Sequence, residues 1–296
     1  MNLINDTMFY VKNETPYPPF KDGLYIEEYF FEFMKTNEIS LKRKYIPAFW
    51  TNLQAKKKYH HDLMKHQKSL DEWFENNPSE GGYFTLCQHA DGIRFNLRNR
   101  DVLIFGGSEG NDILPLIYED KRNTLLSLPR KSWKEKKHLC SFVGAQTHNG
   151  WGKNVRKIIV DKYSENKNFQ IINHLEWKEN VCKQKQDDFI EITSNSKFCL
   201  SPRGYGRSSF RFFESLQMGV IPIYIWDDIE WLPYKDDINY DKFSISINFS
   251  ELDSLENTLL NIDEETYNSM LSEYEKVKHY FTLEGMTNYI IKKIGY

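Results

Sequence analysis

Residues 197–228 constrain the fold more than any other part of the sequence. The apolar run 198–200 predicts a buried strand that ends at Pro202, because proline cannot donate a hydrogen bond to a neighbouring strand. A loop with two glycines, two arginines and two serines follows, and the apolar spacing over 209–218 predicts a helix. The apolar run 220–226 predicts the next strand. This order of strand, loop, helix and strand is typical of a doubly wound α/β fold.

The loop and the first turn of this helix carry the groups that a diphosphate site needs. Backbone N–H groups at a helix N-terminus favour an anion, and Ser208 or Ser209 is suited to cap that end. Arginine forks are permanently charged and match phosphate oxygens. We therefore expect a nucleotide-sugar site formed by Arg203, Gly204, Arg207, Ser208, Ser209 and Arg211.

Glu214 lies three residues after Arg211, so the two side chains share a face of the predicted helix. An ionised carboxylate only accepts hydrogen bonds, which suits the diol of a ribose. The alternative is that Arg211 and Glu214 form a surface ion pair and that the glycines only make a turn. The combination of these residues in one strand, loop and helix favours a nucleotide site.

The letters FCLSPRG, followed by SSFRFFESLQMGVIPIYIWDD, resemble the signature of the exostosin-like glycosyltransferases. That signature reads roughly F-C-L-x-P-x-G, R-x-x-E-A and G-x-I-P-V, and here Ser215 and Ile223 stand where alanine and valine are usual. The resemblance implies a GT-B fold, with two Rossmann-like domains facing across a cleft. It also implies an inverting transfer from a UDP-sugar to an oligosaccharide or other glycan, without a cofactor or a tightly bound metal.

Arg156 is a second candidate for the diphosphate. Residues 138–144 predict a strand, which a loop of small residues up to Gly152 joins to a helix over 154–163. The segment resembles the family's S-F-x-G pattern with its downstream arginine, which implies that Arg156 faces the diphosphate. The alternative is a solvated arginine on a helix surface.

The general base is expected in the first half of the chain. Strands predicted at 83–87 and 102–105 each end in a loop with acidic residues, and functional groups of α/β folds lie just past the carboxyl ends of strands. Asp91 is the first choice as catalytic base, with His89 and Glu109 behind it. Each could instead cap its loop or bind the acceptor.

The length of 296 residues suits two domains, which we place at 1–132 and 133–279, with 280–296 crossing back to the first. We also expect a helix over 22–34, a core strand over 42–50 and a helix over 59–76. The net charge of −3 argues against bulk nucleic-acid binding. No apolar stretch is long enough to cross a membrane, and the N-terminus lacks the features of a signal peptide. These observations predict a cytoplasmic enzyme, of a microbe or a virus.

No D-x-D triplet occurs, and we interpret the pairs Asp227–Asp228 and Asp236–Asp237 as loop acids rather than metal ligands. The sequence does not identify the transferred sugar, and a pentose such as xylose is our guess. One alternative is another nucleotide-using α/β enzyme, such as an epimerase or a dehydrogenase, but residues 42–60 lack the expected G-x-G-x-x-G. The other is a non-catalytic module with a transferase-like fold, which binds glycans or nucleotides.

Overall fold

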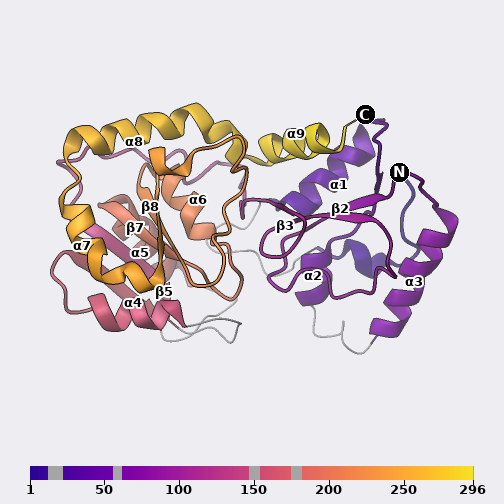
Figure 1. The fold of residues 1–296 in the computed structure, drawn as a ribbon, viewed down its shortest axis with the longest axis horizontal. Coiled ribbons are helices and arrows are strands. Elements are labelled where there is room, and N and C mark those ends of the chain that lie inside the picture. Colours follow the sequence, from indigo (N-terminus) through magenta and orange to yellow (C-terminus); the bar gives the residue numbers. More distant parts are fainter. Residues whose placement is uncertain (13–22, 56–61, 147–153, 175–181, 296) are drawn as a thin grey trace. The chain divides into compact units, whose positions relative to one another are not determined.

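The computed structural model describes residues 1–12, 23–55, 62–146, 154–174 and 182–295 (Figure 1). The chain divides into two compact units. The first contains the N-terminal residues, Leu24–Tyr118 and Thr282–Tyr296, and the second contains Glu119–Phe281. The division falls between Tyr118 and Glu119, and residues 282–296 group with the first unit. Each unit is built on one parallel sheet with helices, so the predicted α/β class is confirmed.

The first unit has a four-stranded parallel sheet in the order β1-β2-β3-β4. Its strands are β1 (Lys44–Tyr45), β2 (Tyr83–Cys87), β3 (Val102–Gly106) and β4 (Asp112–Ile113). Its described helical elements are η1 (Thr7–Tyr10), α1 (Ile26–Thr36), α2 (Trp50–Ala55), α3 (Leu63–Asn76) and α9 (Leu283–Ile294). The helix α9, from the end of the chain, packs beside α1.

Two sequence predictions for this unit need comment. The core strand expected at 42–50 is only two residues long, Lys44–Tyr45; the N–H of Ile46 still donates to the carbonyl oxygen of Phe84 at 2.9 Å, and the chain then turns into α2 at Trp50. The helices expected at 22–34 and 59–76 appear as α1 and α3, although residues 22 and 59–61 lie outside the described residues. Trp50 anchors the core, because its ring packs edge-on against Phe9 and its Nε1–H donates to Thr85 Oγ1 at 2.7 Å.

The second unit has a five-stranded parallel sheet in the order β6-β5-β7-β8-β9. Its strands are β5 (His138–Ala145), β6 (Phe169–His174), β7 (Ser196–Pro202), β8 (Ile221–Trp226) and β9 (Ile245–Asn248). Its α-helices among the described residues are α4 (Val155–Tyr163), α5 (Lys183–Ser194), α6 (Phe210–Gln217), α7 (Leu252–Leu260) and α8 (Glu264–Val277). Because β6 and β7 flank β5 on opposite sides, the winding of the sheet reverses between β5 and β7.

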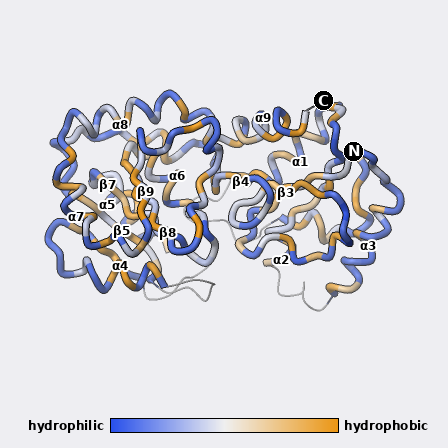
Figure 2. The backbone as a smooth tube through the Cα atoms, in the orientation of Figure 1, coloured by the Kyte–Doolittle hydropathy of each residue, from blue (hydrophilic) through white to orange (hydrophobic). Residues whose placement is uncertain are grey.

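Helices cover both faces of this sheet. One core joins Phe142, Phe198 and Ile223 of the strands to side chains of α4, α7 and α8, while α5 and α6 pack on the other face. The strands therefore carry many hydrophobic residues, which appear as orange segments of the tube in the sheet of this unit in Figure 2. The predicted unit of strand, loop, helix and strand is confirmed as β7, α6 and β8. The helix α6 ends at Gln217 with Met218 as its C-cap, and the expected stop Gly219 follows with a left-handed φ of 69°.

None of the helices in the described part of the chain is long and apolar enough to span a membrane.

Candidate nucleotide-sugar site

The loop 203–209 joins β7 to α6 at the carboxyl end of the sheet. The neighbouring strand β5 ends at the same edge, where the winding of the sheet reverses. Open α/β sheets bind ligands at this position, because loops from the two strands diverge there and leave room above the strand ends. The predicted phosphate loop therefore lies where the topology favours a ligand.

Arg156 reaches this loop from α4. Its Nε donates to the carbonyl oxygen of Arg203 at 3.2 Å, and its Nη1 donates to that of Ala145 at 3.4 Å. The guanidinium thus bridges the carboxyl ends of β5 and β7. Gly204 makes this approach possible, because a Cβ at that position would lie only 2.8 Å from Nη2 of Arg156.

Arg211, in the first turn of α6, lies against the end of β5. Its Nη2 donates to the carbonyl oxygen of Val143 at 2.6 Å, and its guanidinium lies over the rings of Phe142 and Phe189. A Cβ on Gly144 would lie 2.5 Å from Nη2 of Arg211, so a glycine at this position also leaves the space that the arginine occupies. The Nε of Arg211 is buried without a hydrogen-bond partner among the described residues, which leaves one donor for a ligand.

Glu214 lies one turn further along α6 and is half-buried. It makes no hydrogen bond or ion pair with any residue that the structure describes. Burial raises the pKa of this carboxyl from 4.5 to about 7, although the positive charge of Arg211 opposes the increase. A carboxylate without hydrogen-bond partners beside Arg211 is suited to accept hydrogen bonds from a ligand.

Ser208 and Ser209 are both buried at the start of α6. Ser209 occupies the N-cap position with extended backbone, but its side chain makes no capping hydrogen bond. The predicted position of this helix start is confirmed, and the side-chain cap is not. The hydroxyl groups are consequently not used to close the helix end.

Arg203 has a different surrounding from the one expected of a phosphate ligand. Its side chain is only 4% exposed, and its Nη1 lies 2.5 Å from Asp227 Oδ1 and 2.9 Å from Asp228 Oδ1. Two carboxylates thus neutralise a guanidinium that anchors the loop to the end of β8. Asp227 and Asp228 lie in the loop that follows β8, as the sequence predicts. The sequence did not reveal that they pair with the loop arginines.

Arg207 is more accessible than Arg203, with 20% of its side chain exposed. Its Nε donates to Asp228 Oδ2 at 2.9 Å, and its guanidinium lies over the ring of Trp231. The hydroxyl of Tyr224 donates to the carbonyl oxygen of Arg207 at 2.8 Å, which fixes the backbone of the loop. The side chain of Arg207 can therefore change partners while its backbone stays in place.

The candidate bases of the first unit lie at the carboxyl edge of its sheet. His89 and Asp91 follow β2, Glu109 follows β3, and these strands pair in parallel. A Cβ on Gly92 would lie 3.0 Å from Cβ of Glu109, so the two loops contact each other. The structure therefore places the loops that carry these three residues side by side within this unit.

The three candidates differ in their chemistry. His89 Nδ1 accepts the backbone N–H of Asp91, and burial, with help from Arg94, lowers the pKa of His89 to about 4. The neutral ring then carries its proton on Nε2, so His89 is suited to donate a hydrogen bond rather than to take a proton. Asp91 forms an ion pair with Arg94, and Glu109 is exposed.

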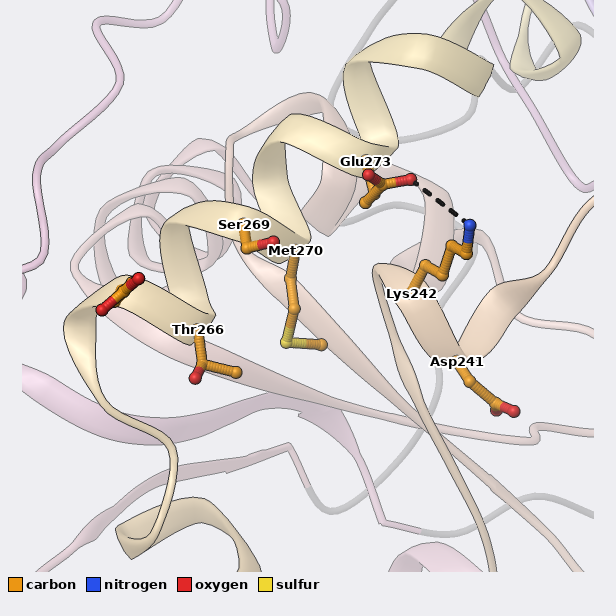
Figure 3. Close-up of a pocket in the computed structure, with 7 residues that line it drawn as sticks. Asp241, Lys242, Thr266, Ser269, Met270 and Glu273 are labelled. Atoms are coloured by element: carbon orange, nitrogen blue, oxygen red, sulfur yellow. Dashed lines mark ion pairs between the residues drawn. The ribbon is translucent and has the colours of Figure 1, made fainter.

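Three further observations concern other places in the chain. Residues 147–153, which include most of the loop expected before Arg156, lie outside the described residues. A depression of about 520 Å³ lies between η3 (Tyr240–Lys242) and α8, where Lys242 and Glu273 pair at 3.9 Å (Figure 3). Because η3 precedes β9, this depression is at the amino end of the sheet, away from the loop 203–209. Within the described ranges, no group of three His, Cys, Asp or Glu side chains could hold a metal ion.

Comparison with known proteins points to one family. A family model described as the Exostosin GT47 domain matches residues 111–262, just over half of the chain. A protein of Arabidopsis thaliana named probable glycosyltransferase is 32% identical over 117 residues, which are 37% of this chain and 24% of that protein. The exostosin-1 homolog of Caenorhabditis elegans is 29% identical over 138 residues, which are 41% of this chain and 34% of that protein.

The alignments therefore span about a quarter to a third of the length of these relatives. Among solved structures, sucrose-phosphate synthase from Thermosynechococcus elongatus aligns with a TM-score of 0.38 and 10% identity, over 88% of this chain and 68% of that one.

Proposed function

The chain belongs to the exostosin GT47 family, and from this premise we propose that it is a glycosyltransferase that moves a sugar from a UDP-sugar to a hydroxyl group of a glycan. The observation that carries the proposal is the set of groups at the adjoining ends of β5 and β7: Arg156 on the loop 203–209, and Arg211 at the end of β5 with the unpartnered Glu214 beside it.

In the proposed reaction, the acceptor oxygen attacks C1 of the donor sugar, and the bond from C1 to the diphosphate oxygen breaks. UDP leaves with the bonding electrons, so negative charge develops on its diphosphate. Arg156 and Arg211, with the N–H groups at the start of α6, are placed to stabilise that charge, and Arg207 and the hydroxyls of Ser208 and Ser209 add donors. This set of donors supports a reaction that needs no bound metal or other cofactor.

Glu214 is assigned to the ribose of the nucleotide. Its carboxylate lies one turn of α6 beyond the phosphate loop and makes no hydrogen bond among the described residues. It would accept hydrogen bonds from the two ribose hydroxyls when ionised. Arg203 is assigned to holding the loop rather than to the diphosphate, since it is buried between Asp227 and Asp228.

The acceptor hydroxyl must lose its proton as it attacks, and attack from the face opposite to the leaving group inverts the anomeric centre. We assign the role of general base, which takes this proton, to Asp91, whose carboxylate is partly exposed beside Arg94. Glu109 is the second choice. His89 is the third choice because its neutral ring presents a donor. The donor sugar is proposed to be a pentose such as xylose, and the site of action the cytoplasm.

The reaction is tested by incubating the protein with UDP-xylose, UDP-glucose, UDP-galactose, UDP-glucuronate and UDP-N-acetylglucosamine, each with a panel of oligosaccharide acceptors. We expect UDP release that depends on an acceptor, in the presence of EDTA, and a product whose anomeric configuration by NMR is opposite to that of the donor. Tight UDP binding without release from any donor would instead favour a non-catalytic binding module. Retention of configuration would refute the inverting mechanism.

A further inference from the structure

Two neighbouring acids that follow β8 hold the two loop arginines in different ways. Asp227 is 4% exposed and lies 2.5 Å from Nη1 of Arg203, which is equally buried. Asp228 is 40% exposed and contacts both arginines, through Oδ1 to Arg203 Nη1 and through Oδ2 to Arg207 Nε, each at 2.9 Å. Asp227 is therefore part of a closed internal pair, whereas Asp228 presents its carboxylate at the surface of the loop.

Asp228 stays in place without Arg207. Its Oδ1 accepts the backbone N–H of Ile229 at 2.7 Å as well as Nη1 of Arg203. Arg207, by contrast, is held at its backbone by Tyr224, and its guanidinium rests on the ring of Trp231. In the ion pair between the two, a carboxylate fixed by other contacts thus meets an arginine whose side chain is partly exposed.

We propose that the Asp228 carboxylate competes with the diphosphate of UDP for Arg207, and so weakens the binding of UDP and speeds its release. The inference rests on the proposed function, because it takes loop 203–209 as the diphosphate site. A guanidinium that pairs with a diphosphate must give up all or part of its contact with Asp228. The fixed negative charge of Asp228 also repels the diphosphate, and the repulsion persists after Arg207 has moved.

The competition would serve turnover. Product release limits the rate of many transferring enzymes, and a diphosphate held by several arginines leaves slowly. An internal carboxylate that takes back one arginine lowers the barrier to release. Asp227 cannot act in this way, because both it and Arg203 are buried, and its role is to position the loop.

The direction in which one substitution changes the affinity for UDP separates these two roles. Asp228→Asn removes the charge but keeps an oxygen that can accept the Ile229 N–H, so the loop retains its anchor. Calorimetric titration with UDP should show affinity that is about tenfold tighter, the effect of about 1.4 kcal/mol. Stopped-flow chase of bound UDP should show slower release. Asp227→Asn, which loosens Arg203, should weaken UDP binding.

Asp236→Asn is the matched control, because Asp236 is an exposed acid in the same segment between β8 and β9 and has no partner among the described residues. It should bind UDP as the unaltered protein does. Unchanged or weaker binding by a folded Asp228→Asn variant would overturn the competition and make Asp228 a positioning residue. If that variant does not fold, Asp228→Ser, which keeps a short oxygen acceptor, is measured in its place against the same criterion.

The inference and the proposed function fail in different ways. If the unaltered protein binds neither UDP nor inorganic pyrophosphate, the site has been misassigned and both are refuted. If the unaltered protein binds UDP and the change at Asp228 does not tighten it, the site stands and the competition is refuted.

Discussion

Replacing Glu214 with glutamine tests the ribose assignment with little change in shape. A hydrogen bond to a charged group contributes about 1.5–3 kcal/mol, so the loss of one such bond to the ribose should weaken UDP-sugar binding by about 10- to 150-fold. Glu165→Gln is the matched control, because Glu165 is exposed and has no partner among the described residues. Its UDP-sugar affinity should equal that of the unaltered protein.

The pH dependence of binding makes the test sharper. The pKa of Glu214 is raised to about 7, and only the ionised carboxylate accepts hydrogen bonds from both hydroxyls. Ionisation is nearly complete at pH 8 but reaches only about a tenth of molecules at pH 6, so affinity should be about tenfold weaker at pH 6. A UDP-sugar is the appropriate ligand because its diesterified diphosphate does not titrate in this range. Glu214→Gln should remove the pH dependence.

The same carboxylate should lower stability when it is ionised. Its pKa in the folded chain lies above the ordinary value of 4.5, so the free energy of unfolding decreases as pH rises from 4.5 to about 7, and the cost is fully present above pH 7. Glu214→Gln should therefore raise Tm by a few degrees at pH 8 and leave it nearly unchanged below pH 4.5. A variant with unaltered Tm and unaltered UDP-sugar affinity at pH 8 would refute both the buried charge and the ribose contact.

Three further predictions concern other parts of the chain. Asp91→Asn should reduce sugar transfer by about 10²- to 10⁴-fold while UDP binding is unchanged, and near-normal turnover would assign the base to another residue. Gly204→Ala should weaken UDP binding in a folded protein, because the new Cβ would lie 2.8 Å from Nη2 of Arg156 and displace it; unaltered affinity by calorimetry would contradict the role of Arg156. Glu27→Ala should destabilise the protein by about 2–4 kcal/mol in urea unfolding. The buried carboxylate accepts hydrogen bonds from the N–H of Gln88 and from the N–H and hydroxyl of Thr51, and all three donors would lose their acceptor. A loss below about 1 kcal/mol would show that water replaces the carboxylate.

The sequence allowed the core of the second unit to be predicted closely. Apolar runs, Pro202 and Gly219 determine where β7, α6 and β8 begin and end, and these are local effects that can be read residue by residue. For Arg156 the sequence left a solvated helix arginine as the alternative, and only the family resemblance implied a position at the diphosphate; the structure places it on the loop through the carbonyl oxygen of Arg203.

Long-range partners could not be read in the same way. Nothing local distinguishes Arg203, which is buried against two acids that follow the next strand, from Arg207, which is partly exposed four residues later. The close approach of arginines to Gly144 and Gly204 is likewise a property of packing between elements. The strand expected over 42–50 was too long because hydrophobicity alone does not show where the chain leaves the sheet and turns into α2.

The central claim is that the loop 203–209 and its neighbours bind the nucleotide of a UDP-sugar. The most direct measurement is the thermal stabilisation of the purified protein by UDP, GDP, CMP and NAD, with and without EDTA. We predict selective stabilisation by UDP that EDTA does not change, and its loss in Glu214→Gln at matched ligand concentration. Stabilisation by NAD, or by no nucleotide, would contradict the account.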